Sequence, residues 1–330
     1  MATKKEAYLS LSAMLRAREP KLLSAERASR MLDAASFEDA AKLLTDCGYG
    51  DLSGCSAAEI EKALAERRNR IFTEMDAMAP DRGIVDLFRM KYDVHNAKTV
   101  LKAEATGQDP LRIMSASGRI APQKLLEAYR EERVSELPKL FGEALLHARE
   151  TLARTENPQK ADFELDKAYF AEMKQTADSV GGSFLKGYVS LLIDTANLRS
   201  AVRTLRMKKS ADFLQEVLIP GGSVDPARIA AAADGEALAA LFASDRLADA
   251  AALGAQAAAG GAQTAFERSC DNAVNRYLRE AKLVSYGSEP LVAYLAAVEG
   301  EITTVRMILT GRLAGIAPET IRERLRDLYA

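Results

Sequence analysis

Hydrophobic positions along the chain recur at the spacing of a helix. In the stretch YDVHNAKTVLK, Asp93, Ala97 and Leu101 share one helical stripe because they follow one another at intervals of four residues. Strong helix formers, chiefly Ala, Leu, Arg and Glu, fill most other windows, and no long alternating run of Val, Ile, Thr or Tyr predicts a strand. The pattern therefore predicts an all-α protein.

The predicted helices recur in the same order three times. Each unit has a capped opening helix, a long central helix and then a helix with a shared polar pattern, which we call the signature helix. The opening helices begin at SAER (24–27), APQK (121–124) and DPAR (225–228), and the central helices carry EIEKALAERRNRIF, FELDKAYFAEM and FERSCDNAVNRYL. Breaks follow the central helices at APDRG (79–83), GGS (181–183) and YGSEP (286–290). We expect three similar helical bundles at 1–110, 111–212 and 213–330, with a final helix from Pro318 to Leu328.

The signature helices carry an acid, an amide three positions on and a cation two positions further. The first copy is YDVHNAKTVLK, the second is IDTANLRSAVR, and VEGEITTVRMILTG is a diverged third copy in which threonine replaces the amide. The signature residues are Asp93, Asn96 and Lys98, then Asp194, Asn197 and Arg199, and finally Glu301, Thr304 and Arg306. The acid and the amide lie at the edge of an apolar face, where each needs a hydrogen-bond partner. Two interpretations stay open: a structural polar pair that fixes helix packing in each unit, or a contact with a neighbouring protein of a larger assembly.

Catalytic and ligand-binding patterns are weak. His95 stands only two residues from Asp93, so the two point to different faces of one helix, and the other copies have no histidine there. The Asp162, Glu164, Asp166 series lacks the glycine and the final glutamate of a calcium loop. Gly-rich segments such as GGSV (221–224) do not continue into a phosphate-binding loop. We therefore expect no catalytic residues, no cofactor and no metal.

Composition excludes further classes. The net charge of −2, with acids and bases interspersed, is unlike that of a nucleic-acid binder. The longest apolar run, LVAYLAAV (291–298), is too short to cross a bilayer, and no secretory signal is evident at the N-terminus. Three cysteines without a CxxC pair fit a reduced, cytosolic protein.

Four sequence segments together resemble those of a known protein family. They are LDKAYF (165–170), DTANLRSAVR (194–203), YGSEPLVAYLAAVEGEITTVRMILTG (286–311) and APETIRERLRDLY (317–329). On these the chain resembles, end to end, the C-type subunits of bacterial and archaeal V/A-type ATPases, which correspond to the d-type subunit of the eukaryotic vacuolar enzyme. Thr304 departs from the pattern, since relatives often carry asparagine there.

The resemblance implies three helical bundles with pseudo-threefold symmetry that form a funnel. It implies a non-catalytic rotor component at the cytoplasmic face of the membrane, with no membrane span of its own. Its partners would be the central-shaft subunits and the membrane proteolipid ring, and it would pass torque between them for proton or sodium transport. The alternatives are an unrelated all-helical repeat scaffold or adaptor, and an all-α enzyme whose pocket collects residues distant in the sequence.

Overall fold

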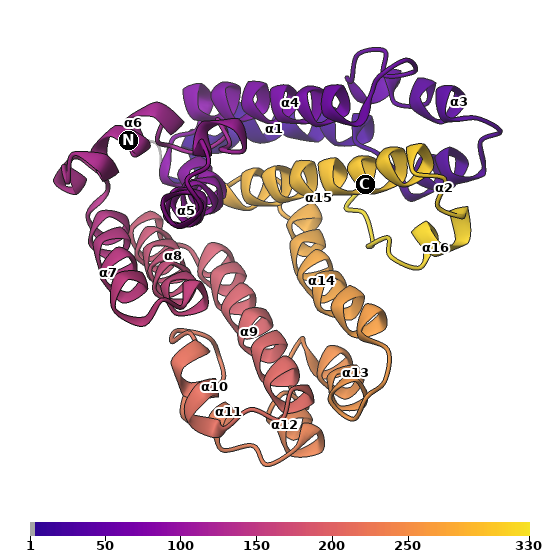
Figure 1. Ribbon diagram of the computed structural model, residues 1–330. Helices are drawn as coiled ribbons and strands as arrows, with labels where there is room; N and C mark the ends of the chain where they lie inside the picture. The colour runs from indigo at the N-terminus through magenta and orange to yellow at the C-terminus, as the bar shows by residue number, and fades with distance from the viewer. Residues whose placement is uncertain (1–3) are drawn as a thin grey trace. The chain divides into compact units, whose positions relative to one another are not determined.

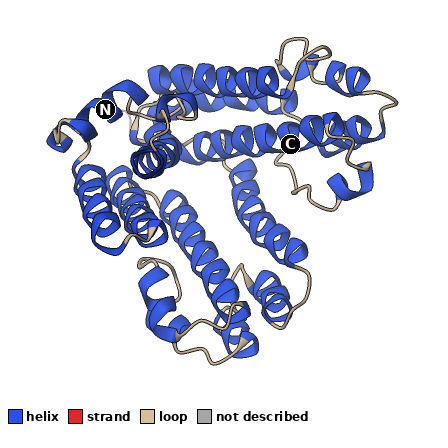
Figure 2. Ribbon diagram, in the orientation of Figure 1, coloured by secondary structure: helices blue, strands red, loops and turns tan. Residues whose placement is uncertain are grey.

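Helices form all the regular structure in this computed structural model, which describes residues 4–330 (Figures 1 and 2). No strand occurs within those residues, which confirms the all-α prediction. Short 3-10 turns join several of the α-helices. The α-helices are α1 (Leu9–Arg18), α2 (Ala25–Asp33), α3 (Phe37–Lys42), α4 (Ala57–Met78), α5 (Gly83–Thr106), α6 (Pro122–Arg130), α7 (Lys139–Thr155), α8 (Pro158–Val180), α9 (Ser183–Arg206), α10 (Ala211–Val217), α11 (Pro226–Ala230), α12 (Gly235–Leu241), α13 (Ala248–Ala258), α14 (Gln263–Arg279), α15 (Ser288–Leu313) and α16 (Pro318–Arg322).

The chain folds into two compact units. The first comprises Met1–Arg82 and Phe242–Ala330, and the second comprises Gly83–Leu241. Along the sequence the predicted order recurs: the opening helices are α2, α6 and α11, the central helices α4, α8 and α14, and the signature helices α5, α9 and α15. The division into repeats at 1–110, 111–212 and 213–330 stays a prediction.

The first unit is built around α15. The residues 291–295 at its start are buried in succession, and further along it keeps a broad buried face that includes Val298 and Leu309, while Gly300 and Thr303 are exposed. It packs against α1, α2, α3 and α4, and its alignment alongside α4 can be followed in Figure 1. Glu301 and Thr304 of the third copy are thus held inside a helical core.

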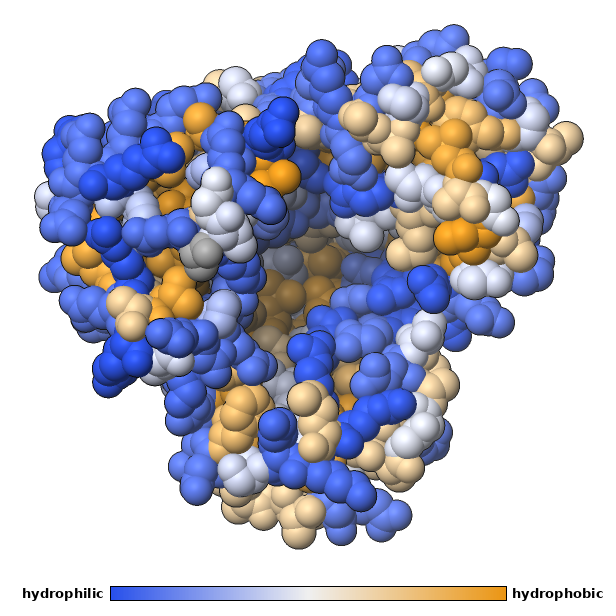
Figure 3. All heavy atoms as spheres, in the orientation of Figure 1, coloured by the Kyte–Doolittle hydropathy of each residue, from blue (hydrophilic) through white to orange (hydrophobic). Residues whose placement is uncertain are grey.

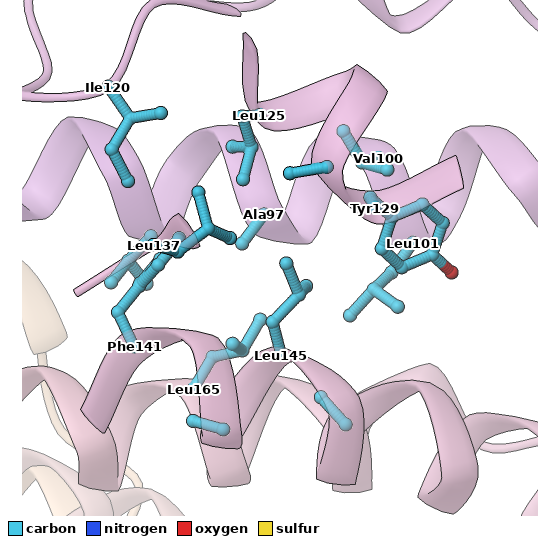
Figure 4. Packing of buried hydrophobic residues seen from close by; sticks show 14 of the residues in the cluster. Ala97, Val100, Leu101, Ile120, Leu125, Tyr129, Leu137, Phe141, Leu145 and Leu165 are labelled. Atoms are coloured by element: carbon cyan, nitrogen blue, oxygen red, sulfur yellow. The ribbon is translucent and has the colours of Figure 1, made fainter. Parts of the chain in front are cut away.

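The second unit has an apolar cluster between α5, α6, α7 and α8. Ala97 and Leu101 of α5 meet Leu125 of α6, Leu145 of α7 and Leu165 of α8 (Figure 4). Ala97, Leu125, Leu145 and Leu165 are fully buried. The stripe that predicts this helix from the sequence is therefore the side of α5 that faces its neighbours.

Helix starts follow the local capping signals. Ser56 and Glu59 form a capping box at the start of α4, in which each side chain accepts from the backbone N–H of the other residue. Asp225 caps α11, because its carboxylate accepts from the Ala227 N–H at 2.9 Å, and Pro226 occupies the first helical position. The start of α11 confirms the capped opening helix predicted at DPAR (225–228).

The predicted final helix is wrong beyond Arg322. α16 ends there, and residues 325–330 have no regular structure. Side chains of α14 bind this segment instead: Asn275 donates to the Asp327 carbonyl and Arg279 to the Leu328 carbonyl. These contacts, together with the burial of Leu328, replace the hydrogen bonds that a further helical turn would have made.

The alanine-rich stretch 227–262 forms most of α11 together with α12 and α13. Ala250 and Ala257 of α13 are fully buried, so small side chains serve here as packing residues.

Hydrophilic residues cover most of the face drawn in Figure 3, with apolar residues in smaller groups between them. Among residues 4–330, no helix combines the length and the apolarity needed to span a bilayer.

Candidate functional site

The first signature copy, on α5, binds the backbone ahead of α6. Asp93 accepts from the Ile120 N–H at 3.1 Å, and Asn96 forms a pair of hydrogen bonds with the backbone of Ser115, at 2.8 Å and 2.7 Å. Both signature side chains are fully buried. The acid and the amide thus fix the connection that leads into the opening helix of the next predicted repeat.

The second copy, on α9, repeats this arrangement ahead of α11. Asp194 accepts from the N–H groups of Ser223, at 2.8 Å, and Val224, at 3.3 Å. Asn197 forms the same double hydrogen bond with the backbone of Ile219, at 2.7 Å and 2.8 Å. In both copies the residue bound by the amide lies five positions before the last residue bound by the acid.

The third copy, on α15, binds the backbone ahead of α2, near the N-terminus. Glu301 is 1% exposed and accepts from the Leu23 N–H at 2.7 Å. It also accepts from the Tyr49 hydroxyl at 2.9 Å and from Arg67 at 2.7 Å and 3.0 Å. Burial and the nearby Glu301 raise the pKa of Tyr49, which therefore acts as a neutral donor. Thr304 does not form the double hydrogen bond with the backbone that Asn96 and Asn197 form in the other copies. It lines a cavity instead.

Each of the three acids accepts a hydrogen bond from a backbone N–H at the same position, two residues before the start of an opening helix. Ile120 and Val224 stand two residues before Pro122 and Pro226, the first residues of α6 and α11, and Leu23 stands two residues before Ala25, which begins α2. The repeated motif therefore joins a signature helix to the backbone just before an opening helix. We call this contact the fastening.

Two glycines allow the aspartates to reach the backbone. A Cβ on Gly118 would overlap Asp93 Oδ1, and a Cβ on Gly222 would overlap Asp194 Oδ1. Each glycine lies two residues before the last amide that the aspartate binds. At the corresponding place in the third copy the chain has Lys21, and the acid is the longer Glu301. The longer side chain reaches its amide without so close a backbone approach.

A second set of charged residues surrounds the acids. Arg119 bridges Asp93, at 2.6 Å, and Glu172 of α8, at 2.7 Å. Burial raises the pKa of Asp93 above its ordinary value of 3.8, while the Arg119 guanidinium opposes that rise. Local sequence patterns do not indicate Arg67, Arg119 and Glu172, because their partners lie 234, 26 and 53 residues away and no local spacing marks such pairs.

Two of the signature cations form ion pairs with residues other than the buried acids. Lys98 binds Asp166 of α8 at 2.7 Å, and Arg306 binds Glu61 of α4 at 2.6 Å. Arg199 of the second copy is half-buried. These pairs lie nearer the surface than the acids do.

No catalytic arrangement emerges from the geometry of residues 4–330. His95 is exposed, with its ring nitrogen 3.3 Å from the Ile113 carbonyl, and it does not contact Asp93. In the same range, no group of three or more His, Cys, Asp or Glu side chains could hold a metal ion. The buried acids are occupied by backbone N–H groups and arginines, so they serve as hydrogen-bond acceptors.

Comparison with known families decides the classification. A sequence model of the family described as "ATP synthase (C/AC39) subunit" matches residues 11–324, nearly the whole chain. The chain belongs to this family.

Individual relatives carry consistent names. The chain is 24% identical to the C-type subunit of the V-type sodium ATPase of Enterococcus hirae, over 98% of this chain and 99% of the relative. It is 22% identical to the C-type subunit of the A-type ATP synthase of Methanocaldococcus jannaschii, over 97% of this chain and 86% of the relative. It is 25% identical to the corresponding V-type ATP synthase protein of Thermus thermophilus, over 59% of this chain and 62% of the relative. The family is therefore one of subunits of ATP-linked complexes and not of free-standing enzymes.

Proposed function

We propose that this member of the C/AC39 family is the non-catalytic coupler of a V/A-type rotary ATPase. In this role it sits at the cytoplasmic face of the membrane and joins the central shaft of the ATPase head to the proteolipid ring. Rotation then passes through it during proton or sodium transport. The hydrogen-bond pattern of the three signature helices is the observation that carries the proposal.

That pattern is cyclic along the chain. Asp93 of the first predicted repeat binds Ile120 of the second, and Asp194 of the second binds Val224 of the third. Glu301 of the third then binds Leu23 of the first. A linear stack of repeats would leave its last fastening without a partner, whereas a closed ring uses all three. The pattern supports a pseudo-threefold, funnel-like arrangement of 1–110, 111–212 and 213–330, which suits a part that receives a shaft.

Stiffness of the helix pairs supports the same role. Between α4 and α15, Arg67 binds Glu301 at 2.7 Å and Arg68 binds Glu299 at 2.9 Å. The side chains of these four residues are at most 11% exposed. Buried ion pairs with good geometry fix the register of two helices, because sliding would leave charges unpaired in a medium of low dielectric. A coupler needs such fixed registers to transmit torque with little loss.

The same contacts favour a structural role for the signature residues over direct contact with a neighbouring protein. The acids and amides bind backbone groups within the chain, which leaves them unavailable to another protein. We therefore assign Asp93, Asn96, Asp194, Asn197 and Glu301 to internal fastening.

Binding to both neighbours tests the proposal. The full chain, tagged, is mixed with the shaft proteins alone, with the detergent-solubilised proteolipid ring alone, and with both. The coupler role predicts recovery of each partner singly and of a ternary assembly that requires this chain. Failure to bind either the shaft or the ring contradicts the role, and binding to neither would favour an unrelated scaffold.

A further inference from the structure

A cavity rich in arginine lies within the first unit, apart from the signature acids. Its volume is about 480 Å³, within the range of roughly 300–1,000 Å³ that small-molecule sites occupy. It is bounded by α2, α14, α15 and α16 and by the C-terminal segment, which we define as residues 323–330. Four arginines line it: Arg268, Arg279, Arg322 and Arg326.

Two of the four arginines are neutralised by carboxylates. Arg322 binds Asp33 at 2.6 Å, and Arg326 binds Asp271 at 2.8 Å. Neither pair leaves a net charge for a ligand.

The other two arginines donate to carbonyl groups. Arg268 donates through Nη1 to the Glu323 carbonyl at 3.2 Å, and Arg279 donates through Nη2 to the Leu328 carbonyl at 2.6 Å. A carbonyl accepts a hydrogen bond but carries no charge, so two positive charges remain beside the cavity. Among the lining residues that the structure describes, Asp327 is the one acid, and it offsets only one of these charges.

Donor groups also remain available. Each guanidinium has five N–H donors in a planar fork, and Arg268 and Arg279 each use a single nitrogen in these contacts. Asn272 lines the same cavity and accepts from the Asp327 N–H through Oδ1, which leaves its NH₂ group to donate. The cavity thus offers a surplus of donors and of positive charge, which is the combination that binds phosphate oxygens.

We propose that this cavity binds a small phosphate-bearing anion between α14 and the C-terminal segment. The anion contacts Arg268, Arg279 and Asn272, all of which already hold that segment. Its binding therefore strengthens the attachment of the C-terminal segment to α14. This site is independent of the coupling role proposed above.

Calorimetric titration of the full chain with inorganic pyrophosphate tests the site. We expect saturable binding with one site per chain, weakened about tenfold or more in Arg268→Gln and in Arg279→Gln, since each removes a charge-assisted hydrogen bond. Arg276→Gln is the matched control: Arg276 is on the same helix, pairs with Asp249 at 3.7 Å, and does not line the cavity. The affinity of the Arg276→Gln variant for pyrophosphate should stay within about twofold of wild type, because the variant loses the same charge but keeps the cavity intact.

Two further measurements ask which kind of phosphate compound binds, and whether its binding tightens the attachment of the C-terminal segment. Co-sedimentation with phosphatidic acid vesicles, against phosphatidylcholine vesicles, shows whether a lipid headgroup occupies the site in place of a soluble anion. Hydrogen exchange of residues 323–330 should slow when the anion is bound. The proposal is overturned if neither pyrophosphate nor the vesicles bind, or if Arg276→Gln weakens binding as much as Arg268→Gln does.

Discussion

Substitution of Glu301 by alanine should disrupt the fastening between α15 and the N-terminal segment. The carboxylate accepts from three groups: the Leu23 N–H, the Tyr49 hydroxyl and the Arg67 guanidinium. In the variant the Arg67 side chain, 10% exposed, keeps its charge without its partner. Breaking a buried pair in this way costs about 3–5 kcal/mol, and the orphaned Leu23 amide adds about 1–3 kcal/mol. We expect a total loss of at least about 4 kcal/mol from the free energy of unfolding.

Urea titration followed by circular dichroism measures this loss, and hydrogen exchange localises it. Exchange at the Leu23 amide should accelerate strongly in Glu301→Ala. The matched control is Arg306→Ala on the same helix, whose pair with Glu61 is 38% and 47% exposed and should contribute at most about 1 kcal/mol.

A double variant tests the reasoning behind the magnitude. Arg67→Met with Glu301→Met removes both charges together, so only the polar groups of Leu23 and Tyr49, which Glu301→Ala orphans as well, contribute, at about 1–3 kcal/mol each. It should therefore be more stable than Glu301→Ala alone. A Glu301→Ala loss below about 1 kcal/mol, similar to an exposed pair, would refute the assignment of a buried fastening.

Two other predictions concern local packing and pH. Gly118→Ala and Gly222→Ala should each lower the free energy of unfolding, measured by urea titration, by about 1–3 kcal/mol, because the added methyl overlaps the aspartate. Gly54→Ala is the control and should be nearly neutral, since there is open space where its Cβ would lie. Equal effects at all three positions would contradict the close approach of the aspartates to Gly118 and Gly222. Arg18, through its hydrogen bonds, lowers the pKa of Glu74 in the folded protein below the ordinary 4.5. The pair therefore stabilises the fold fully at a pH above the ordinary pKa, and this stabilisation is lost as the pH falls through the lowered pKa. The stability difference between wild type and Glu74→Gln should be present at pH 7 and disappear as the pH falls through the lowered pKa of Glu74, and a difference that persists below that pKa would show that it has another origin.

The sequence predicted most of what depends on neighbours along the chain. Helical stripes such as Asp93, Ala97 and Leu101 located the signature helices, and the Asp-Pro pair at 225–226 located the start of α11. The need of a buried acid for partners also followed from its position on an apolar face.

Long-range partners could not be predicted in the same way. Arg67 meets Glu301 across 234 residues, and nothing near either residue marks the pair. The C-terminal segment has good helix formers, yet contacts with Asn275 and Arg279 override that propensity.

Two glycines in the sequence do mark a long-range contact. Gly118 and Gly222 precede the opening helices in the two copies that use aspartate, while the copy that uses Glu301 has Lys21. The paired change of acid length and glycine indicates contact between the two positions.

Coupling in the assembled complex tests the central claim most directly. Complexes depleted of this chain are placed in liposomes, and ATP hydrolysis and ion uptake are measured together before and after the purified chain is added back. We expect the depleted complex to hydrolyse ATP without moving ions, and add-back to restore ion uptake in proportion to the chain bound. Ion uptake that proceeds undiminished without the chain would contradict its role as the coupler.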